Sequence, residues 1–156
     1  MDYNKTYNKY LKKYSYHNFG KSHRDPKNKS YQTFIIIPCY AEYNYIFLTL
    51  DSINKQNELF LKQSLIIVVI NNSSSDKSII RKNNQRTFNK LINKKYKYEF
   101  IIIDCFSSKY ELNPKIAGVG IARKIGMDYC LPLVKDKYSL LYSLDADTLL
   151  HPDYMK

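Results

Sequence analysis

The sequence predicts an α/β fold with a mostly parallel sheet and helices on both faces. Short apolar runs rich in β-branched residues recur along the chain, and such runs are typical of strands buried on both faces. Amphipathic stretches of helical periodicity separate these runs. Strands that alternate with helices imply parallel pairing with crossover connections.

The first 32 residues are polar and rich in tyrosine. Four side chains here fall at helical spacing: Tyr7, Tyr10, Leu11 and Tyr14. They predict a short amphipathic helix. Residues 21–30 contain a proline and several charges, which is typical of a linker. We therefore expect residues 1–32 to form a loosely docked extension and linker, and residues 33–156 to form the domain.

The first predicted strand begins at Thr33 and runs through three isoleucines. Pro38 is expected to end it, because proline lacks the N–H group that a strand ladder uses. After a short loop, Ile46, Leu50 and Ile53 fall on one face of a predicted helix.

Two further apolar runs, residues 65–70 and 99–103, predict the second and third strands. The loop of residues 71–76 between them is dense in asparagine and serine, which favour turns and helix N-termini. A helix is therefore predicted from about Lys77 to about Lys94.

The last predicted helix covers residues 118–130 and begins with Gly118 and Gly120. These glycines permit either close approach of a ligand or tight packing of the helix on the sheet. An apolar run at 138–144 predicts a fourth, buried strand. The sequence His-Pro-Asp at 151–153 predicts the start of another helix, because proline suits a first turn.

The fourth predicted strand ends on two carboxylates, Asp145 and Asp147, separated by one small residue. Carboxylates this close raise one another's pKa unless a cation lies beside them. Mg²⁺ typically binds one or two carboxylates together with substrate phosphates, and open α/β sheets bind ligands beyond the carboxyl ends of their strands. The pair therefore predicts a metal–diphosphate site, and the alternative is a polar strand end that caps the next turn.

Polar clusters follow the other predicted strands too, at residues 40–42, at 71–76 and at Asp104. The carboxyl ends of parallel strands meet at one edge of a sheet. We therefore expect these clusters to gather with Asp145 and Asp147 on one rim, which favours a ligand site over a cap.

The formal net charge is +11, from 25 Lys and Arg against 14 Asp and Glu. Such a charge can favour nucleic acid or an anionic membrane surface. The lysines are scattered, however, and accompany heavy use of asparagine, isoleucine and tyrosine, which indicates a coding bias. We expect no nucleic-acid partner.

The three cysteines, Cys39, Cys105 and Cys130, are widely spaced. They indicate neither a zinc site nor a disulfide framework, and a reducing compartment is the simplest setting. The first 20 residues lack the apolar h-region typical of a signal peptide, and no apolar stretch approaches the ~20 residues that span a membrane. We expect a cytoplasmic protein, with peripheral attachment to the inner face of the cytoplasmic membrane as the alternative.

Four motifs occur in a fixed order: IIIPCYAE, IIVVINNSSSD, KIAGVGIARKIGMD and YSLLYSLDADTLLHPDYM. With them, residues 33–155 resemble the nucleotide-binding N-terminal half of a family-2 glycosyltransferase with the GT-A (Rossmann-like) fold. The motifs are similar to that family's PxYNE strand end, its VVDDGSxD strand end, its helix with glycines and an arginine, and its DxD motif followed by a proline.

The resemblance implies an enzyme that binds a nucleoside-diphosphate sugar through Mg²⁺ or Mn²⁺ and transfers a hexosyl-type sugar to an unknown glycan or lipid-linked acceptor. The metal would act as a Lewis acid on the departing nucleoside diphosphate. The roles that the resemblance implies are the nucleoside pocket for Pro38, Tyr40 and Glu42, the base for Asn71, the diphosphate for Arg123, the ribose and metal for Asp145, and the metal for Asp147.

The sequence departs from the family at two points. Asn71 stands where the family usually has an aspartate, and an amide both donates and accepts where a carboxylate only accepts. The sequence given stops at Lys156, before the segment in which the family has its acceptor site and catalytic base. We therefore expect a fold truncated after the DxD strand, with uncovered apolar surface and a tendency to self-associate.

Two alternatives to an active transferase stay open. The first is a donor-binding fragment that transfers no sugar. The second is a nucleotidyltransferase, which ranks lower because it would need a glycine-rich, basic loop after the first strand. The loop PCYAEYN has neither glycine nor lysine.

Overall fold

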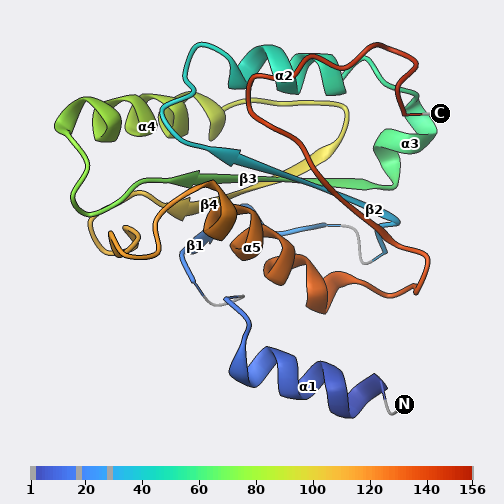
Figure 1. Ribbon diagram of the computed structural model, residues 1–156. Coiled ribbons are helices and arrows are strands. Elements are labelled where there is room, and N and C mark those ends of the chain that lie inside the picture. Colours follow the sequence, from blue (N-terminus) through green and yellow to red (C-terminus); the bar gives the residue numbers. More distant parts are fainter. Residues whose placement is uncertain (1–2, 17–18, 28–29, 156) are drawn as a thin grey trace.

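The computed structural model describes residues 3–16, 19–27 and 30–155. The described chain forms one five-stranded sheet in the order β1-β4-β3-β2-β5 (Figure 1). The strands are β1 (Lys21–His23), β2 (Thr33–Cys39), β3 (Ser64–Asn71), β4 (Glu99–Cys105) and β5 (Leu140–Ser143). The helices are α1 (Tyr3–Lys13), α2 (Ile46–Ile53), α3 (Glu58–Lys62), α4 (Ser78–Leu91) and α5 (Val119–Cys130), followed by a 3₁₀ turn, η1 (Leu131–Leu133).

The prediction of an α/β fold with a mostly parallel sheet is confirmed. Strands β2 to β5 pair in parallel, and only β1 is antiparallel to its neighbour β4. Helices α2 and α4 cover one face, and α5 covers the other (Figure 1). Side chains therefore alternate between two cores along β2: Ile35 and Ile37 face α2, whereas Phe34 and Ile36 face α5.

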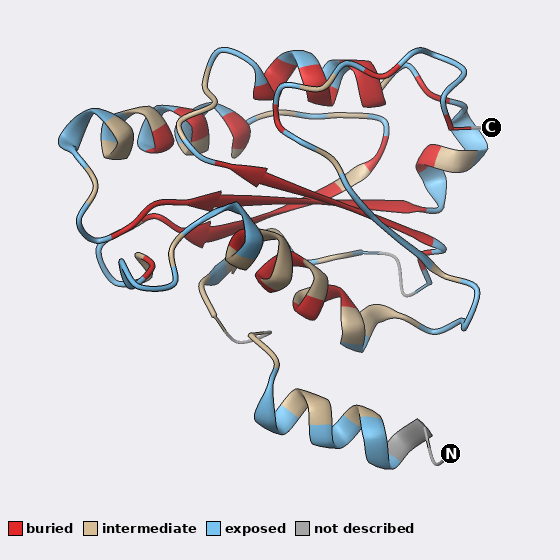
Figure 2. Cartoon of the chain, in the orientation of Figure 1, coloured by how far each residue is buried: buried red, intermediate tan, exposed pale blue. Residues whose placement is uncertain are grey.

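Strands β2 and β3 are buried along their whole length, as their unbroken apolar sequences predict (Figure 2). Helix α5 packs so tightly on them that a Cβ atom at Gly126 would come within 2.5 Å of Ile36 Cγ2. At Gly118 and Gly120 an added Cβ would have no neighbour within 4 Å. Tight helix–sheet packing therefore explains Gly126, and space lies open beside the two earlier glycines.

The expectation of a loosely docked linker before residue 33 was wrong. Residues Lys21–His23 form β1, which pairs with β4. Gly20, with φ +81°, lets the chain pass so close that an added Cβ would lie 2.7 Å from the carbonyl oxygen of Asp104. Arg24 donates to the carbonyl oxygens of Ile92 and Lys94, both at 2.7 Å, where α4 ends. A short polar edge strand has no apolar periodicity, so sequence patterning could not reveal it.

The predicted amphipathic helix near the N-terminus is confirmed as α1. Asp128 of α5 is buried, and it accepts hydrogen bonds from the Tyr10 hydroxyl and the Tyr16 N–H, both at 2.7 Å. Lys124 completes this cluster with a 2.8 Å ion pair to Asp128. The N-terminal segment is therefore fixed to α5 by a specific polar cluster.

Two strand predictions need correction. Pro38 lies inside β2 rather than after it. The pairing of β2 with β5 ends at Ile36, whose carbonyl oxygen accepts from Leu144. The ring nitrogen of Pro38 points toward the β5 side of the strand, as the backbone groups of Ile36 do. The ladder between β2 and β5 has already ended at this position, so the missing N–H of Pro38 costs no hydrogen bond. Strand β5 is exposed rather than buried, because it is an edge strand.

The segment after β5 continues differently from the prediction. Residues 151–153 form a turn, not the start of a helix. The segment instead runs back over α2, where Leu150 N–H donates to Ser52 Oγ at 3.1 Å and Met155 N–H donates to Gln56 Oε1 at 3.0 Å. The short helix α3, capped by the side chain of Asn57, was not predicted. In the described parts of the chain, none of the helices combines the length and apolar character of a membrane span.

Candidate functional site

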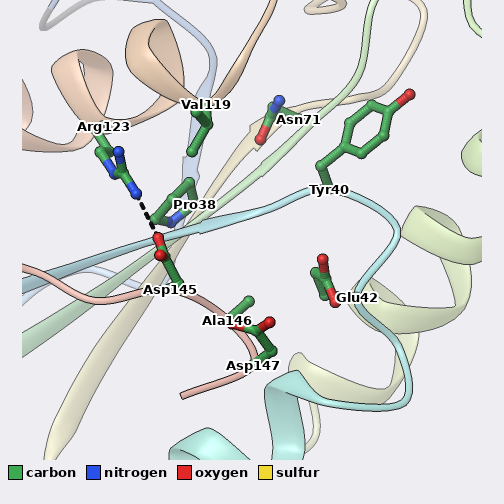
Figure 3. Close-up of a pocket in the computed structure, with 9 residues that line it drawn as sticks. All are labelled: Pro38, Tyr40, Glu42, Asn71, Val119, Arg123, Asp145, Ala146 and Asp147. Atoms are coloured by element: carbon green, nitrogen blue, oxygen red, sulfur yellow. Dashed lines mark hydrogen bonds and ion pairs between the residues drawn. The ribbon is translucent and has the colours of Figure 1, made fainter.

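A pocket of about 320 Å³ lies at the carboxyl ends of β2, β3 and β5 (Figure 3). We call it the carboxylate pocket. Its lining residues are Pro38, Tyr40, Glu42, Asn71, Val119, Arg123, Asp145, Ala146 and Asp147. All seven residues singled out from the sequence therefore lie around one cavity, although they come from four separate segments of the chain.

The loop after β2 presents Tyr40 and Glu42 in a conformation that α4 holds in place. Ala41 has φ +58°, a left-handed conformation that is uncommon for a residue with a side chain. Its N–H donates to Asn84 Oδ1 at 2.9 Å, and the N–H of Tyr43 donates to Asn83 Oδ1 at 3.1 Å. Such conformations persist where the surroundings over-determine them, and they cluster at functional sites.

The end of β5 directs its two aspartates to different parts of the pocket. Ala146 between them is buried, and its carbonyl oxygen accepts a 2.6 Å hydrogen bond from Thr49 Oγ1 of α2. Figure 3 shows Asp145 directed toward Arg123, and Asp147 on the side of Ala146 where Glu42 lies. The small residue in the Asp-Ala-Asp sequence is therefore the buried anchor of the site.

Arg123, in the second turn of α5, forms an ion pair with Asp145. The two side chains are 36% and 57% exposed, so solvent screens the pair and it contributes little to stability. The Nε atom of Arg123 is buried and has no hydrogen-bond partner among the described residues. The guanidinium thus holds one carboxylate and retains a donor for a further group.

Glu42 and Asp147 form the second charged pair, of like sign. The pKa of Glu42 is raised, first by its burial and then by the negative charge of Asp147. A proton or a cation between the two carboxylates relieves this repulsion. The resemblance implied a nucleoside-lining role for Glu42, but the carboxylate that raises its pKa is Asp147, which the resemblance implied as the metal ligand.

The described residues contain no ready-made cluster of three or more His, Cys, Asp or Glu side chains for a metal. Such a cage is not required for Mg²⁺, which keeps several waters and uses one or two carboxylates plus substrate phosphates. Asp147 and Glu42 supply hard oxygen donors and a net negative charge, and Asp145 lies two residues away. The donor set therefore fits a divalent ion that arrives with a phosphate ligand.

Asn71, at the end of β3, is buried, and its Oδ1 atom has no hydrogen-bond partner among the described residues. Its carbonyl oxygen is held by Asn84 Nδ2 at 2.9 Å. A buried acceptor left unpaired costs about 1–3 kcal/mol. Since Asn71 lines the cavity, we expect an N–H group of a ligand to satisfy this oxygen.

A second cavity of about 400 Å³, the serine pocket, adjoins the first and shares Tyr40, Asn71 and Val119 with it. Its other lining residues are Ser73, Ser75, Asp76, Pro114, Ala117 and Gly118. The pKa of Tyr40 is raised, first by burial and then by Asp76, whose carboxylate accepts from the Tyr40 hydroxyl. The two cavities are therefore direct neighbours, on either side of Tyr40, Asn71 and Val119.

Two lining residues were missed by sequence reasoning, and one residue expected on the rim serves elsewhere. Val119 and Ala146 carry no chemical signal, and only their positions beside Gly118 and between the aspartates could have indicated them.

Asp104 accepts from the N–H groups of Phe106 and Ser107 at 3.0 and 2.9 Å, so it caps its own loop and does not line the pocket.

Comparison of the chain with family models, with curated proteins and with solved structures finds no match.

Proposed function

We propose that the carboxylate pocket binds the diphosphate of a nucleoside-diphosphate sugar together with Mg²⁺ or Mn²⁺. One observation carries this proposal: a pocket at the carboxyl ends of parallel strands holds an arginine paired with Asp145, together with Glu42, whose pKa is raised by burial and by the charge of Asp147. A cation suits the Glu42–Asp147 pair, because Asp147 raises the pKa of Glu42, and an anion suits Arg123. A metal–diphosphate supplies both charges in one ligand.

The proposed binding event exchanges the partners of the Arg123–Asp145 ion pair. Arg123 turns to the phosphate oxygens, which match a guanidinium geometrically. Asp145 and Asp147 would hold the metal, and Glu42 would supply further negative charge. The bound ion would offset the charge that develops on the departing nucleoside diphosphate.

The nucleoside is proposed to occupy the region around Asn71 and Tyr40. The unpaired Oδ1 of Asn71 accepts from an N–H group on the edge of the base, and uracil and guanine both carry such a ring N–H. The half-exposed ring of Tyr40 offers a face for stacking. The serine pocket beyond them gives room for the base or ribose.

We propose that the ligand is a sugar donor and that the chemistry is glycosyl transfer to a glycan or lipid-linked acceptor, as the resemblance to family-2 glycosyltransferases implies. A second candidate is donor binding without transfer. It is favoured by the roles of the pocket's carboxylates: Asp145 is paired with Arg123, and Glu42 and Asp147 are both proposed to face the cation. None of them is left to act as a general base, a function that typically contributes ~10²–10⁴-fold.

Equilibrium dialysis with labelled UDP-, GDP- and CDP-sugars in Mn²⁺ tests donor binding, and the same donors with a mixed acceptor pool test transfer. Retention of at least one donor that an excess of its own nucleoside diphosphate displaces would support the proposal. Acceptor-dependent transfer that Asp147→Asn abolishes would favour the enzyme over the binding protein. Retention of none of the donors would overturn the proposal.

A further inference from the structure

Asn84 of α4 is a fully buried amide at a position where the helix faces the core. The buried residues of this helix are Asn84, Thr87 and Leu91, and their spacing of three and four places them on one face. Apolar side chains normally fill such a face. A buried amide is costly unless its polar atoms are hydrogen-bonded, so the partners of Asn84 indicate what it does there.

The hydrogen bonds of this side chain join two separate segments of the chain. Its Oδ1 atom accepts from the N–H of Ala41 at 2.9 Å, on the loop after β2. Its Nδ2 atom donates to the carbonyl oxygen of Asn71 at 2.9 Å and to Oδ1 of Asn72 at 3.1 Å, at the end of β3. A side-chain amide has two donor hydrogens and one acceptor oxygen. Asn84 therefore uses both donors on the end of β3 and its acceptor on the loop.

These bonds begin where the pairing of β2 with β3 ends. The last paired residues are Cys39 and Ile70, and the next residue of each segment, Tyr40 or Asn71, lines the carboxylate pocket. Beyond the ladder, Asn84 bonds to both backbones. The spacing between the two segments at the pocket therefore depends on this side chain.

A second set of bonds holds the same network from the other side. Asn72 is fully buried, and its Nδ2 atom donates to Glu111 Oε1 at 3.1 Å. Glu111 forms an ion pair with Arg81 of α4. The chain of side chains thus begins and ends on α4 and runs beneath the pocket. Supporting bonds of this kind fix the direction of the groups that meet a ligand.

We propose that Asn84 is a positioning residue of the carboxylate pocket, which sets the distance between the loop after β2 and the end of β3. The loop carries Tyr40 and Glu42, and the strand end carries Asn71. The inference rests on the proposed function, in which these side chains meet the base and the cation. Asn84 itself lines neither cavity, so it acts through Ala41 and the end of β3.

Replacement of Asn84 tests this role through binding. Asn84→Ala leaves the Ala41 N–H and two oxygens at the end of β3 without this partner. We expect it to weaken both UDP and uridine at least about 10-fold in Mn²⁺, measured by competition titration at a temperature where urea denaturation shows the variant to be folded. The effect on uridine separates this residue from Arg123, whose removal is expected to leave uridine binding unchanged.

Thr87→Val is the matched control. Thr87 is equally buried on the same face of α4, but its hydroxyl bonds within the helix, to the carbonyl oxygen of Asn83 at 3.0 Å. The variant should therefore lose some stability and keep the affinity of the unmodified chain for UDP and uridine. An equal loss of affinity in Thr87→Val and Asn84→Ala would contradict the proposal.

A second substitution separates positioning from a general loss of stability. Ala41 has a left-handed conformation, φ +58°, which is unfavourable for alanine and readily adopted by glycine. Ala41→Gly should therefore restore UDP affinity about 3-fold or more in the Asn84→Ala background, relative to its effect in the unmodified chain. Loss of stability alone predicts no such recovery, and its absence would contradict the proposal.

Amide hydrogen exchange supplies a measurement that needs neither a nucleotide nor a folded variant. In the unmodified chain the Ala41 N–H should exchange more slowly than an amide in an unstructured peptide, because its bond to Asn84 must open first. Exchange at the unstructured rate, or equal UDP affinity in a folded Asn84→Ala, would overturn the role of Asn84. Failure of the unmodified chain to bind a nucleoside diphosphate would instead overturn the proposed function, so the two failures can be distinguished.

Discussion

Arg123 and Asp145 form an ion pair across the mouth of the carboxylate pocket, so that a cation and one of the two aspartates neutralise each other. Both side chains are more than a third exposed, and such pairs contribute at most about 1 kcal/mol. Opening the pair therefore costs little. A ligand that brings both a cation and an anion can replace it with two stronger contacts.

The first prediction concerns the anionic part of that ligand. Arg123→Ala should weaken UDP by about 10-fold or more, because a hydrogen bond between charged groups contributes about 1.5–3 kcal/mol. Uridine, which has no phosphate, should bind with unchanged affinity. Competition titration of both ligands checks this, with Lys82→Ala on α4 as a control that removes the same charge outside the pocket. Equal weakening of UDP and uridine would assign Arg123 to the fold instead.

Asn71→Leu should have opposite effects on stability and on binding. Leucine has a similar volume and no unpaired acceptor, so removal of the buried Oδ1 should raise the free energy of unfolding by about 1 kcal/mol or more. The same change removes the acceptor proposed for the base, so UDP affinity should fall about 10-fold. Urea denaturation and calorimetry measure the two effects. A variant that is both less stable and unimpaired in binding would contradict the assignment.

The raised pKa of Glu42 predicts how the stability of the fold depends on pH. Because its pKa is raised in the folded protein, the folded state binds more protons than the unfolded state between the ordinary value of 4.5 and the raised value. The free energy of unfolding therefore falls as the pH rises through this interval, and the whole of this loss is present at pH 7. Glu42→Gln should raise the melting temperature at pH 7 and have a smaller effect at pH 4.

The same carboxylate is proposed to face the cation, so Glu42→Gln should also weaken Mn²⁺-dependent binding at pH 7. Thermal denaturation at the two pH values, with and without Mn²⁺ and UDP, separates the effects. A melting temperature that falls equally at both pH values would show that Glu42 has a purely structural role.

The glycines of α5 form a matched pair for a fourth prediction. Gly126→Ala should destabilise the fold by about 1–3 kcal/mol, since its Cβ would overlap Ile36. Gly120→Ala has open space and a helical position, so it should leave stability unchanged or raise it by up to about 1 kcal/mol. If the ligand approaches the start of α5, only Gly120→Ala should weaken binding without loss of stability, as measured by urea denaturation and calorimetry.

Much of the fold and the pocket could be predicted because two of the strands that support the site, β2 and β3, are buried on both faces. An unbroken apolar run such as Leu65 to Ile70 is favourable only where both faces of the strand are buried. Parallel strands then bring their following polar residues to one edge, which is why Asn71 and Asp145, 74 positions apart, could be expected in one site.

The parts that could not be predicted depend on tertiary context. Strand β1 is polar and three residues long, and it exists because β4 offers it an edge. The exposure of β5 depends on its place at the end of the sheet, which periodicity does not encode. The ion pair of Arg123 with Asp145 and the effect of Asp147 on Glu42 depend on where α5 and the loop after β2 lie relative to the end of β5.

The central claim is that the pocket binds a nucleoside diphosphate through a divalent ion, and calorimetric titration of UDP and GDP with and without Mn²⁺ tests it most directly. We expect binding in Mn²⁺ that EDTA abolishes. Asp147→Asn should lose the metal-dependent part because an amide carries no charge to offset the cation, whereas Asp51→Asn on α2 should keep it. Equal affinity in Mn²⁺ and EDTA, or no effect of Asp147→Asn, would contradict the claim.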